Sequence, residues 1–583
     1  MNDTLTTGEL FPSDPTIFAA GKLHWTLFAS LAFTICLGWI SSFLKSGLRV
    51  PGPRGVPIFG SILELRKGHA ITFDAWAQKY KDMFRVVLGS KEIVILNTRA
   101  AVAKTLIKQG ANYQTRPEWD LWHETFVHSA NTGGVLTIGT SRWSPDVSRL
   151  RKTLGPHTTA QKLPRYNHFV SRRYHRLVKL LSEATAEPKD LGYTWWSTTV
   201  SLVTDSMVGF KHDEDFVKLI CETEIGIFRL RGLGFPFSDW VPLLSLSDVV
   251  IKTVASNLRR AASLLRIPTP SFLLNEKEEK CNDLRSNQAK YCHQQLADLD
   301  ERLRNGDPTP SQLGDMFRSL PEPLPYREQY LLMTTLAGSG MAIGSTLNWL
   351  MGYLASYPEL QDKAYNAIHE VYNGAVPDPH DTDRVEYLKA MAIEAGRYWT
   401  PIRLGFFRET HKDSQVDEHF LPKGTMVVYN SYQINRDPTA YDFPDKFIPE
   451  RWMNGHQGRT DTTEVIGKIG VPHMGHGAGR RYCLGIPSVN KSFYGVLSLA
   501  LHFFKFERAE LDSKGLKTVF PPFRACGQTS TEMDPIKDQI SPIEAQGLPR
   551  ATGIRVTARD PEQLAAWIET GHTELRDWEA PWA

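Results

Sequence analysis

The segment from Pro472 to Gly485 constrains the fold more than any other part of the chain, because it surrounds one cysteine with glycines and two adjacent arginines. Its sequence is PHMGHGAGRRYCLG. A thiolate persists near neutral pH where positive charge and N–H donors stabilise it, and this loop offers both. The glycines let the backbone fold closely around the sulfur. The loop therefore predicts that Cys483 is a single axial thiolate ligand of haem iron.

The same loop allows further interpretations. Arg480 and Arg481 are candidates for charged hydrogen bonds to the haem propionates. A plain glycine-rich surface loop is one alternative. A zinc site made of His473, His476 and Cys483 is another, although no fourth ligand and no second ligand pair are evident.

Composition excludes several classes of protein. The chain has 583 residues, of which 41% are hydrophobic and 22% are charged, so it is not a disordered chain. Its net charge of +3 is too balanced for a dedicated nucleic-acid binder, and no nucleic-acid partner is expected. The six cysteines form no C-x-x-C pair, which argues against a disulfide scaffold or a multi-cysteine zinc fold.

The amino-terminal region predicts a membrane anchor. Residues 23–44 contain no Asp, Glu, Lys or Arg, and a helix of that length spans roughly 33 Å, enough to cross a bilayer. Lys45, Arg49 and Arg54 follow it, which favours a cytosolic body and a lumenal tail at 1–22. The alternative is a buried helix of a soluble domain. A proline-rich hinge at 45–60 then leads into the body at 61–583, which includes a carboxy-terminal extension.

The body is expected to be mainly α with small β-sheets. Strand-like runs at 84–88 and 92–96 flank a Gly-Ser turn, whereas residues 160–400 show mostly helical periodicity. One helix is predicted from Gln329 to Pro358, and its polar residues and glycines argue against a second membrane span. Its glycines, above all Gly338, Gly340 and Gly344, suggest a core helix that passes a large flat ligand, with tight helix packing as the alternative.

The cysteine loop resembles that of cytochrome P-450, the haem-thiolate monooxygenases, whose pattern is F-x-x-G-x-R-x-C-x-G. Gly479, Arg481, Cys483 and Gly485 match in register, and His476 stands at the Phe position. The resemblance implies a cytochrome P-450 fold preceded by one transmembrane helix. It also implies a haem b cofactor whose iron is bound by Cys483.

Two further groups of residues support the resemblance. Glu394 and Arg397 match the family's E-x-x-R helix and Arg451 matches its P-E-R-F/W loop, which implies scaffold roles for all three. Trp143 and Arg149 lie on a predicted helix where the family binds a haem propionate. The spacing there is similar to the fungal phenylacetate-hydroxylase branch, as is the Thr-Arg-Pro run at 115–117.

The chain departs from the family in its long helix. The family usually carries an acid–threonine pair that supplies protons for oxygen activation, in the pattern A/G-G-x-D/E-T. Here Ser339, Gly340 and Met341 occupy that segment and provide neither group. A coupling, isomerisation or dehydration on the same fold, without oxygen insertion, therefore stays open as an alternative, as does a non-enzymatic haem sensor.

The resemblance implies a fungal, microsomal monooxygenase in the endoplasmic reticulum membrane, single-pass, with its catalytic domain on the cytosolic side. Electrons would come from NADPH through NADPH–cytochrome P-450 reductase, with cytochrome b5 as an optional second donor. The expected substrate is an apolar, aromatic small molecule of secondary metabolism. By family position, the segments that would face it are 113–127, 225–244, 335–342 and 400–404, which are rich in aromatic and aliphatic residues.

Overall fold

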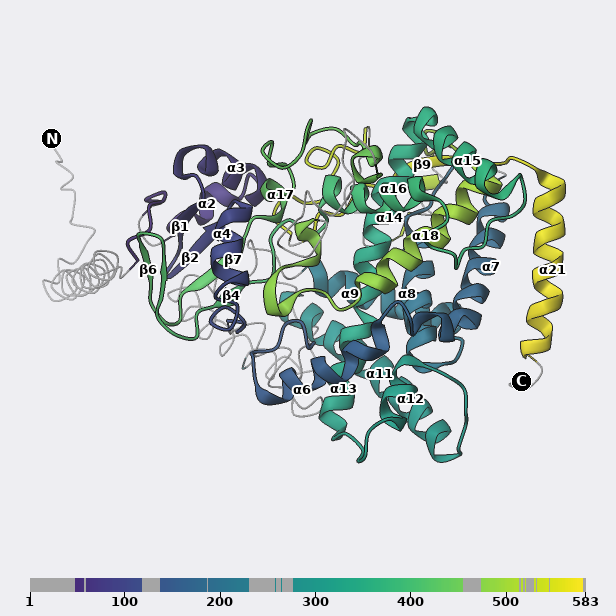
Figure 1. The fold of residues 1–583 in the computed structure, drawn as a ribbon, viewed down its shortest axis with the longest axis horizontal. Coiled ribbons are helices and arrows are strands. Elements are labelled where there is room, and N and C mark those ends of the chain that lie inside the picture. Colours follow the sequence, from purple (N-terminus) through teal and green to yellow (C-terminus); the bar gives the residue numbers. More distant parts are fainter. Residues whose placement is uncertain are drawn as a thin grey trace, which may run out of the picture.

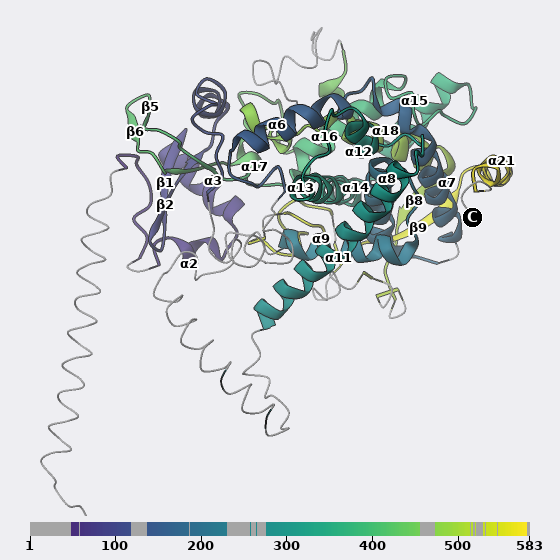
Figure 2. The same cartoon turned by 90° about the horizontal axis from the view of Figure 1, so that it is seen from below.

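The computed structural model shows a mainly helical body with a small sheet region at one end and a carboxy-terminal helix at the other (Figures 1 and 2). This agrees with the fold class expected from the sequence. The residues that the structure describes are 48–56, 59–117, 137–185, 187–229, 257, 264, 276–454, 473–512, 515–516, 519–520, 529–530, 532–544 and 546–579.

The largest sheet has the strand order β1-β2-β7-β4. Strands β1 (Met83–Leu88) and β2 (Lys91–Leu96) form the hairpin predicted from the sequence, and Gly89 adopts a φ of 59° at its turn. Strand β7 (Met426–Tyr429) pairs parallel to β2, and the short β4 (Arg408–Glu409) pairs antiparallel to β7. The sheet therefore joins the beginning of the body to a segment more than 300 residues further along the chain.

A second sheet joins the middle of the chain to its end. Strand β9 (Gly553–Ala558) lies between β3 (Lys189–Asp190) and β8 (Phe504–Arg508). A separate hairpin consists of β5 (Ser414–Val416) and β6 (His419–Leu421). Strand β9 thus brings the carboxy-terminal part of the chain into a three-stranded sheet.

Helices build the rest of the body. The main ones are α3 (His69–Tyr80), α6 (Pro145–Leu154), α7 (Asn167–Glu183), α8 (Gly192–Val208), α9 (Glu214–Arg229), α11 (Glu276–Arg304), α12 (Gln312–Arg318), α13 (Tyr326–Ala337), α14 (Ser339–Ser356), α15 (Pro358–Tyr372), α16 (Glu386–Trp399), α18 (Ile486–Phe503) and α21 (Pro561–Glu579). Shorter turns are α2 (Ile62–Leu65), α4 (Arg99–Val102), α17 (Ser431–Ile434), the π-helical η1 (Ala103–Ile107) and the 3-10 turns η2 (Gly155–Thr158), η3 (Leu163–Tyr166), η6 (Pro449–Trp452), η9 (Met474–His476) and η10 (Gly479–Arg481).

The long helix predicted at 329–358 is divided into α13 and α14. Gly338 ends α13 and stands at the N-cap of α14 with ψ of −12°, which differs from the ψ of a regular helix. The prediction of one unbroken helix is therefore wrong at this point. Within the ranges that the structure describes, every helix is too short or too polar to cross a bilayer.

Two glycines of α14 serve helix packing. A Cβ at Gly340 would lie 2.7 Å from the Cα of Val200, and one at Gly344 would lie 2.2 Å from the Cδ1 of Trp196, both on α8. The prediction that these two positions face a ligand is wrong, because α8 occupies that space. Tight helix packing, the alternative, explains both residues.

A buried polar network ties α7 to α8. Arg173 donates two hydrogen bonds to Asp205, at 2.6 and 3.2 Å, and His212 Nδ1 lies 2.8 Å from the same carboxylate. Burial raises the pKa of Asp205, but the Arg173 charge and the His212 hydrogen bond outweigh it, so the net shift is downward. The charge on Asp205 thus contributes to the stability of the fold.

The segment just before β9 forms hydrogen bonds both to α14 and to the loop after α16. Gly547 donates its N–H to the carbonyl of Pro401 at 2.7 Å and accepts a 2.8 Å hydrogen bond from Trp349 Nε1. Gln546 Nε2 donates to Ser345 Oγ at 2.8 Å. Residues after α18 therefore complete the core around α14.

The amino-terminal predictions fall largely outside the described residues. The predicted tail at 1–22 and anchor at 23–44 lie entirely outside them. Part of the predicted hinge packs on the first sheet: the N–H of Arg85 donates to the carbonyl of Pro51 at 2.8 Å, and Gly60 forms an isolated antiparallel β-bridge with Leu88. The division of the chain into tail, anchor, hinge and body stays a prediction.

Candidate active site

The cysteine loop consists of η9, η10 and the residues that lead into α18. The N–H of Cys483 donates to the carbonyl of His476 at 2.9 Å, which folds the loop back on itself. The Cys483 sulfur accepts a 3.3 Å hydrogen bond from the N–H of Gly485, just before the first turn of α18. Helix N-termini favour negative charge, so the loop holds the sulfur where a thiolate is stabilised.

Two opposing effects act on the pKa of the Cys483 thiol. Burial raises the pKa of Cys483, whereas the Gly485 N–H and the charge of Arg151 lower it, and the net shift is upward. The side chain is nevertheless exposed to the space in front of the loop. Because a metal ion deprotonates a coordinating thiol, this position suits a sulfur that becomes a thiolate when iron binds.

Gly479 brings the loop against η1. Its φ is 63°, and a Cβ added there would lie 2.0 Å from the carbonyl oxygen of Leu106. A side chain is excluded by both the backbone conformation and the contact. The glycine that the family pattern requires therefore fixes the approach of the loop to this turn.

A cavity of about 330 Å³ lies in front of Cys483. Helices α13 and α14 contribute Thr335, Ser339 and Thr346 to its lining, and the loop after α16 contributes Pro401 and Ile402. Four arginines gather at the cysteine end of the cavity; they are Arg116, Arg151, Arg408 and Arg481.

Backbone carbonyls hold two of these arginines. Arg116 donates to the carbonyls of Gly139 and Phe407 at 2.9 and 2.8 Å. Arg481 donates to those of Gln114 and Ile138 at 2.9 and 2.8 Å. The carbonyls orient both guanidinium groups but carry no charge that would neutralise them.

The arginine cluster concentrates buried positive charge that a bound anion would neutralise. Burial lowers the pKa of Arg408 to about 10 and that of Arg481 to about 9, and neighbouring arginines add to both shifts. Burial and the charges of Arg408 and Arg481 likewise hold the pKa of Arg116 well below its usual range. No carboxylate of the described ranges forms an ion pair with these three, and the Nε atoms of Arg408 and Arg481 have no hydrogen-bond partner there.

These residues fit a haem. A thiolate ligand for iron and a cluster of buried, unneutralised guanidinium groups at the edge of one cavity match the two chemical demands of iron protoporphyrin, an axial ligand and partners for two carboxylates. Cys483 would bind the iron, and Arg116, Arg408 and Arg481 are placed for the propionates.

The structure separates the residues predicted to accompany Cys483. The face of the Trp143 ring lies 5.4 Å from the guanidinium carbon of Arg481. Arg480 is exposed. Arg149 does not line the cavity and instead forms ion pairs with Glu328 and Asp146. Arg151 follows Arg149 by two residues, so the two side chains point to opposite sides of α6, and only Arg151 reaches the cavity.

His476, at the family's Phe position, lines the cavity and packs on His473 with ring centroids 4.5 Å apart. Burial lowers the pKa of His476 to about 4, so the imidazole is neutral at physiological pH. Among the described residues, no group of three or more His, Cys, Asp or Glu side chains could hold a metal ion. The zinc alternative is therefore wrong.

The three residues at the position of the family's acid–threonine pair point in different directions in the structure. Ser339 lines the cavity, and its hydroxyl donates to Leu336 O at 2.6 Å. Gly340 packs against α8, and Met341 is buried in the core with an exposure of 1%. Of these three candidates only Ser339 faces the cavity, and what role it has stays a prediction.

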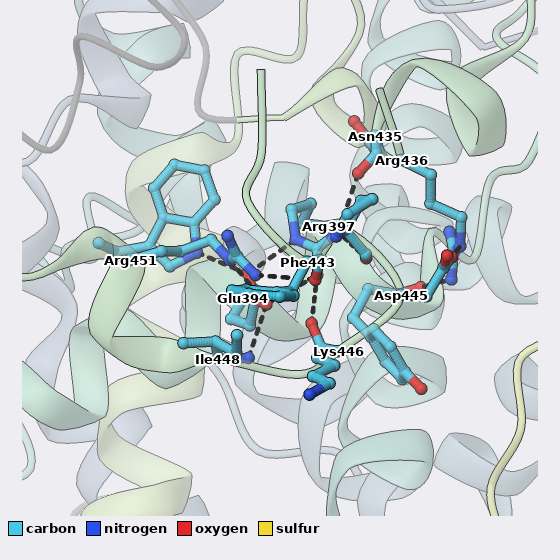
Figure 3. A network of polar contacts seen from close by, with 12 residues as sticks. Glu394, Arg397, Asn435, Arg436, Phe443, Asp445, Lys446, Ile448 and Arg451 are labelled. Carbon is cyan, nitrogen blue, oxygen red and sulfur yellow. Dashed lines mark hydrogen bonds and ion pairs between the residues drawn. The ribbon is translucent and has the colours of Figure 1, made fainter. Parts of the chain in front are cut away.

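The predicted scaffold residues lie together (Figure 3). Glu394 accepts hydrogen bonds from Arg397 Nε and Nη2 at 2.8 and 2.7 Å and from Arg451 Nε at 3.1 Å. Arg397 also donates to the carbonyl of Asn435, and the Asn435 side-chain oxygen accepts the N–H of Met474. The network thus links α16 directly to the start of the cysteine loop.

Sequence reasoning missed several cavity residues. Arg116 belongs to the Thr-Arg-Pro run at 115–117, and Arg151 lies on the same predicted helix as Arg149 without a signal that distinguishes the two. Arg408 and Glu224 carry no sequence signal. The predicted substrate segments 335–342 and 400–404 contribute to the cavity lining. Residues 118–127 and 230–244 of the other two segments lie outside the described ranges.

Comparison with known proteins agrees with this site. The family model for cytochrome P-450 matches residues 50–518. The 3-hydroxyphenylacetate 6-hydroxylase of Emericella nidulans is 26% identical over 92% of this chain and 95% of its own length. The phenylacetate 2-hydroxylase of the same organism is 24% identical over 89% and 92%. A cytochrome P-450 monooxygenase of Mycosarcoma maydis is 25% identical over 86% and 91%.

Proposed function

Because the chain belongs to the cytochrome P-450 family of haem monooxygenases, we propose that it oxidises an aromatic small molecule at a haem iron bound by Cys483. One observation carries this proposal: Cys483 and a cluster of buried arginines line the same cavity, and within the described ranges no carboxylate pairs with Arg116, Arg408 or Arg481. Both relatives from Emericella nidulans are named for hydroxylation of phenylacetates.

Each part of the cavity has its own task in this proposal. The haem supplies the activation of dioxygen when it is bound. Cys483 holds the iron, and the Gly485 N–H stabilises its thiolate. Arg116 and Arg481, oriented by backbone carbonyls, hold the propionates. The apolar residues of α13, α14 and the 401–402 turn exclude water and orient an aromatic ring.

The cellular setting is also proposed. The uncharged run at 23–44 with basic residues after it supports a single-pass anchor in the endoplasmic reticulum membrane and a cytosolic body. Electrons would then come from NADPH through the reductase, with cytochrome b5 as an optional second donor. The relatives from Emericella nidulans support a fungal setting, and a role in secondary metabolism stays a prediction.

One observation favours a second function. The position of the family's acid–threonine pair holds Gly340 and Met341, and neither residue faces the cavity. An isomerisation or dehydration without oxygen insertion needs neither an oxidant nor that proton supply, whereas a coupling would still need dioxygen as its oxidant. Turnover without NADPH and dioxygen would therefore point to isomerisation or dehydration, and the gain of an oxygen atom in the product distinguishes the monooxygenase from a coupling.

The test uses the full chain, expressed with haem and purified in detergent. The reduced protein is expected to give the thiolate-type Soret shift with carbon monoxide, and Cys483→Ala should lose it. Cys292→Ala, which changes a buried cysteine of α11, is the matched control and should keep it. A wild-type protein that binds haem without this shift, or a Cys483→Ala variant that retains it, would refute the proposal.

A further inference from the structure

Strand β7 carries a tyrosine at the edge of the arginine cluster. Tyr429, the last residue of the strand, is 3% exposed and lines the cavity in front of Cys483. Its hydroxyl forms no hydrogen bond to any residue in the described part of the chain. A hydroxyl that is removed from water is costly unless an acceptor is supplied to it. The surroundings of Tyr429 therefore indicate which bound group supplies that acceptor.

The register of the first sheet brings Tyr429 close to Arg408. Strand β4 pairs antiparallel with β7, and Arg408 lies opposite Val427. Side chains two residues apart on a strand share a face, so Tyr429 lies on the face of Val427 and diagonal to Arg408. Diagonal neighbours are about 7–8 Å apart, within reach of two long side chains. The sheet therefore places a phenol and a guanidinium group together at the cysteine end of the cavity.

Two glycines define the position of the Tyr429 side chain. The N–H of Gly405 donates to the carbonyl of Tyr429 at 2.9 Å, and a Cβ at Gly405 would lie 1.9 Å from the ring carbon Cζ. The ring thus occupies the space that a side chain at Gly405 would need. A Cβ at Gly477 would lie 3.4 Å from the hydroxyl oxygen. The hydroxyl is therefore held beside the cysteine loop.

The charges around Tyr429 keep its hydroxyl a donor. Burial raises the pKa of Tyr429, the charges of Arg408 and Arg116 lower it, the charge of Cys483 raises it again, and the net shift is upward. The phenol therefore keeps its proton at neutral pH. The arginines repel one another, which contributes to their lowered pKa values. A neutral donor adds a hydrogen bond to this cluster without adding to the repulsion.

Three donors at this end of the cavity lack an acceptor. Besides the Tyr429 hydroxyl, the buried Nε atoms of Arg408 and Arg481 have no hydrogen-bond partner among the described residues. A carboxylate accepts hydrogen bonds at two oxygens, each with two lone-pair directions, so one such group can serve several donors. Haem carries two carboxylates at one edge. The donor set thus fits a propionate better than it fits an apolar substrate.

We propose that the Tyr429 hydroxyl donates a hydrogen bond to a haem propionate, beside Arg408, and so acts as a positioning residue for the haem. This inference rests on the proposed function and adds a neutral donor from β7 to the arginines assigned there. A hydrogen bond to a charged group is roughly twice as strong as one between neutral groups. The hydroxyl therefore contributes to the retention of the haem in the cavity.

The test uses the haem-loaded full chain and the variant Tyr429→Phe, which removes one oxygen and keeps the ring that packs on Gly405. Tyr387→Phe is the matched control, because Tyr387 of α16 is also buried, its hydroxyl also lacks a partner among the described residues, and it lies outside the cavity lining. Neither change removes a hydrogen bond between described residues. A difference between the two variants therefore reports on the bound group.

Two measurements are made on each ferric protein at pH 7.5. Transfer of haem to apomyoglobin is expected to be about tenfold or more faster from Tyr429→Phe than from the wild type, the range for a lost hydrogen bond to a charged group. Tyr387→Phe should stay within twofold. The propionate bending band of the resonance Raman spectrum should move to lower frequency in Tyr429→Phe, because this mode softens when a propionate loses a hydrogen bond. Tyr387→Phe should leave the band unchanged.

Several results would overturn the inference. Faster haem transfer with an unchanged propionate band would show that the hydroxyl only supports the fold, and an unchanged transfer rate would show that it does not retain the haem. An unchanged propionate band together with a shifted Soret maximum of the carbon-monoxide complex would assign the hydroxyl to the Cys483 sulfur. A wild-type chain that binds haem without the thiolate-type spectrum would instead refute the proposed function, so the two failures are distinguishable.

Discussion

The buried network at the start of the cysteine loop allows a quantitative prediction for Glu394→Gln. The Glu394 carboxylate accepts two hydrogen bonds from Arg397 and one each from Arg451, Trp452 Nε1 and the N–H of Ile448. Glu394 and Arg397 are fully buried, and the Arg451 side chain is 3% exposed. The substitution keeps the shape but turns one acceptor oxygen into a donor and leaves two buried arginines without a carboxylate.

The expected loss in the free energy of unfolding is about 3–5 kcal/mol, the usual cost of removing one partner from a buried ion pair. This is a large fraction of the roughly 5–15 kcal/mol that stabilises a typical folded protein. The control is Lys389→Met, which breaks the exposed pair with Asp383, where both side chains are at least half exposed. That change should cost under about 1 kcal/mol.

Unfolding in guanidinium chloride, followed by tryptophan fluorescence and by loss of the haem Soret band, measures the stability of both variants. We expect the midpoint of Glu394→Gln to fall well below that of the control and the Soret band to be lost first, because the network reaches Met474 through Asn435. A loss no larger than that of Lys389→Met would refute the assignment of this network as a main support of the loop.

Three further predictions concern the site and its frame. Gly479→Ala puts a Cβ 2.0 Å from a carbonyl oxygen, so haem content per protein should fall by more than half in a pyridine haemochrome assay; normal loading would contradict the packing of this loop. Arg481→Ala should speed haem transfer to apomyoglobin about tenfold or more, since a charged hydrogen bond is lost, whereas Arg149→Ala should change the rate less than twofold. Equal rates for the two variants would argue against the propionate assignment. In Asp205→Asn, urea unfolding should show a loss of stability at pH 7 that shrinks as the pH falls below 3.8, because the depressed pKa of Asp205 contributes stability only above its unfolded value. A constant difference from pH 7 to pH 3 would contradict that shift.

The parts of the site that lie close together in sequence were predictable. Glycines, arginines and a cysteine within one loop reveal their chemistry by spacing alone, and the hairpin at 83–96 follows from two β-branched runs around a Gly-Ser turn. Glu394 and Arg397 are three residues apart on one helix face, so their pairing could also be expected.

The parts that tertiary packing decides were not predictable. Arg116 and Arg408 come from segments almost 300 residues apart, and nothing in either segment says that both reach one cavity. Arg149 and Arg151 are equally plausible in sequence, and only the orientation of α6 separates them. Glycines signal close approach but not what approaches, and at Gly340 and Gly344 it is the neighbouring α8.

The contacts of residues 546–552 have a consequence for biosynthesis. Gln546 and Gly547 hold Ser345, Trp349 and Pro401, and β9 follows them directly to complete the second sheet. These partners leave the ribosome long before the residues that fasten them. The nascent chain therefore cannot close its pocket until residues 546–552 have left the ribosome, so stable capture of the prosthetic group follows the synthesis of this segment.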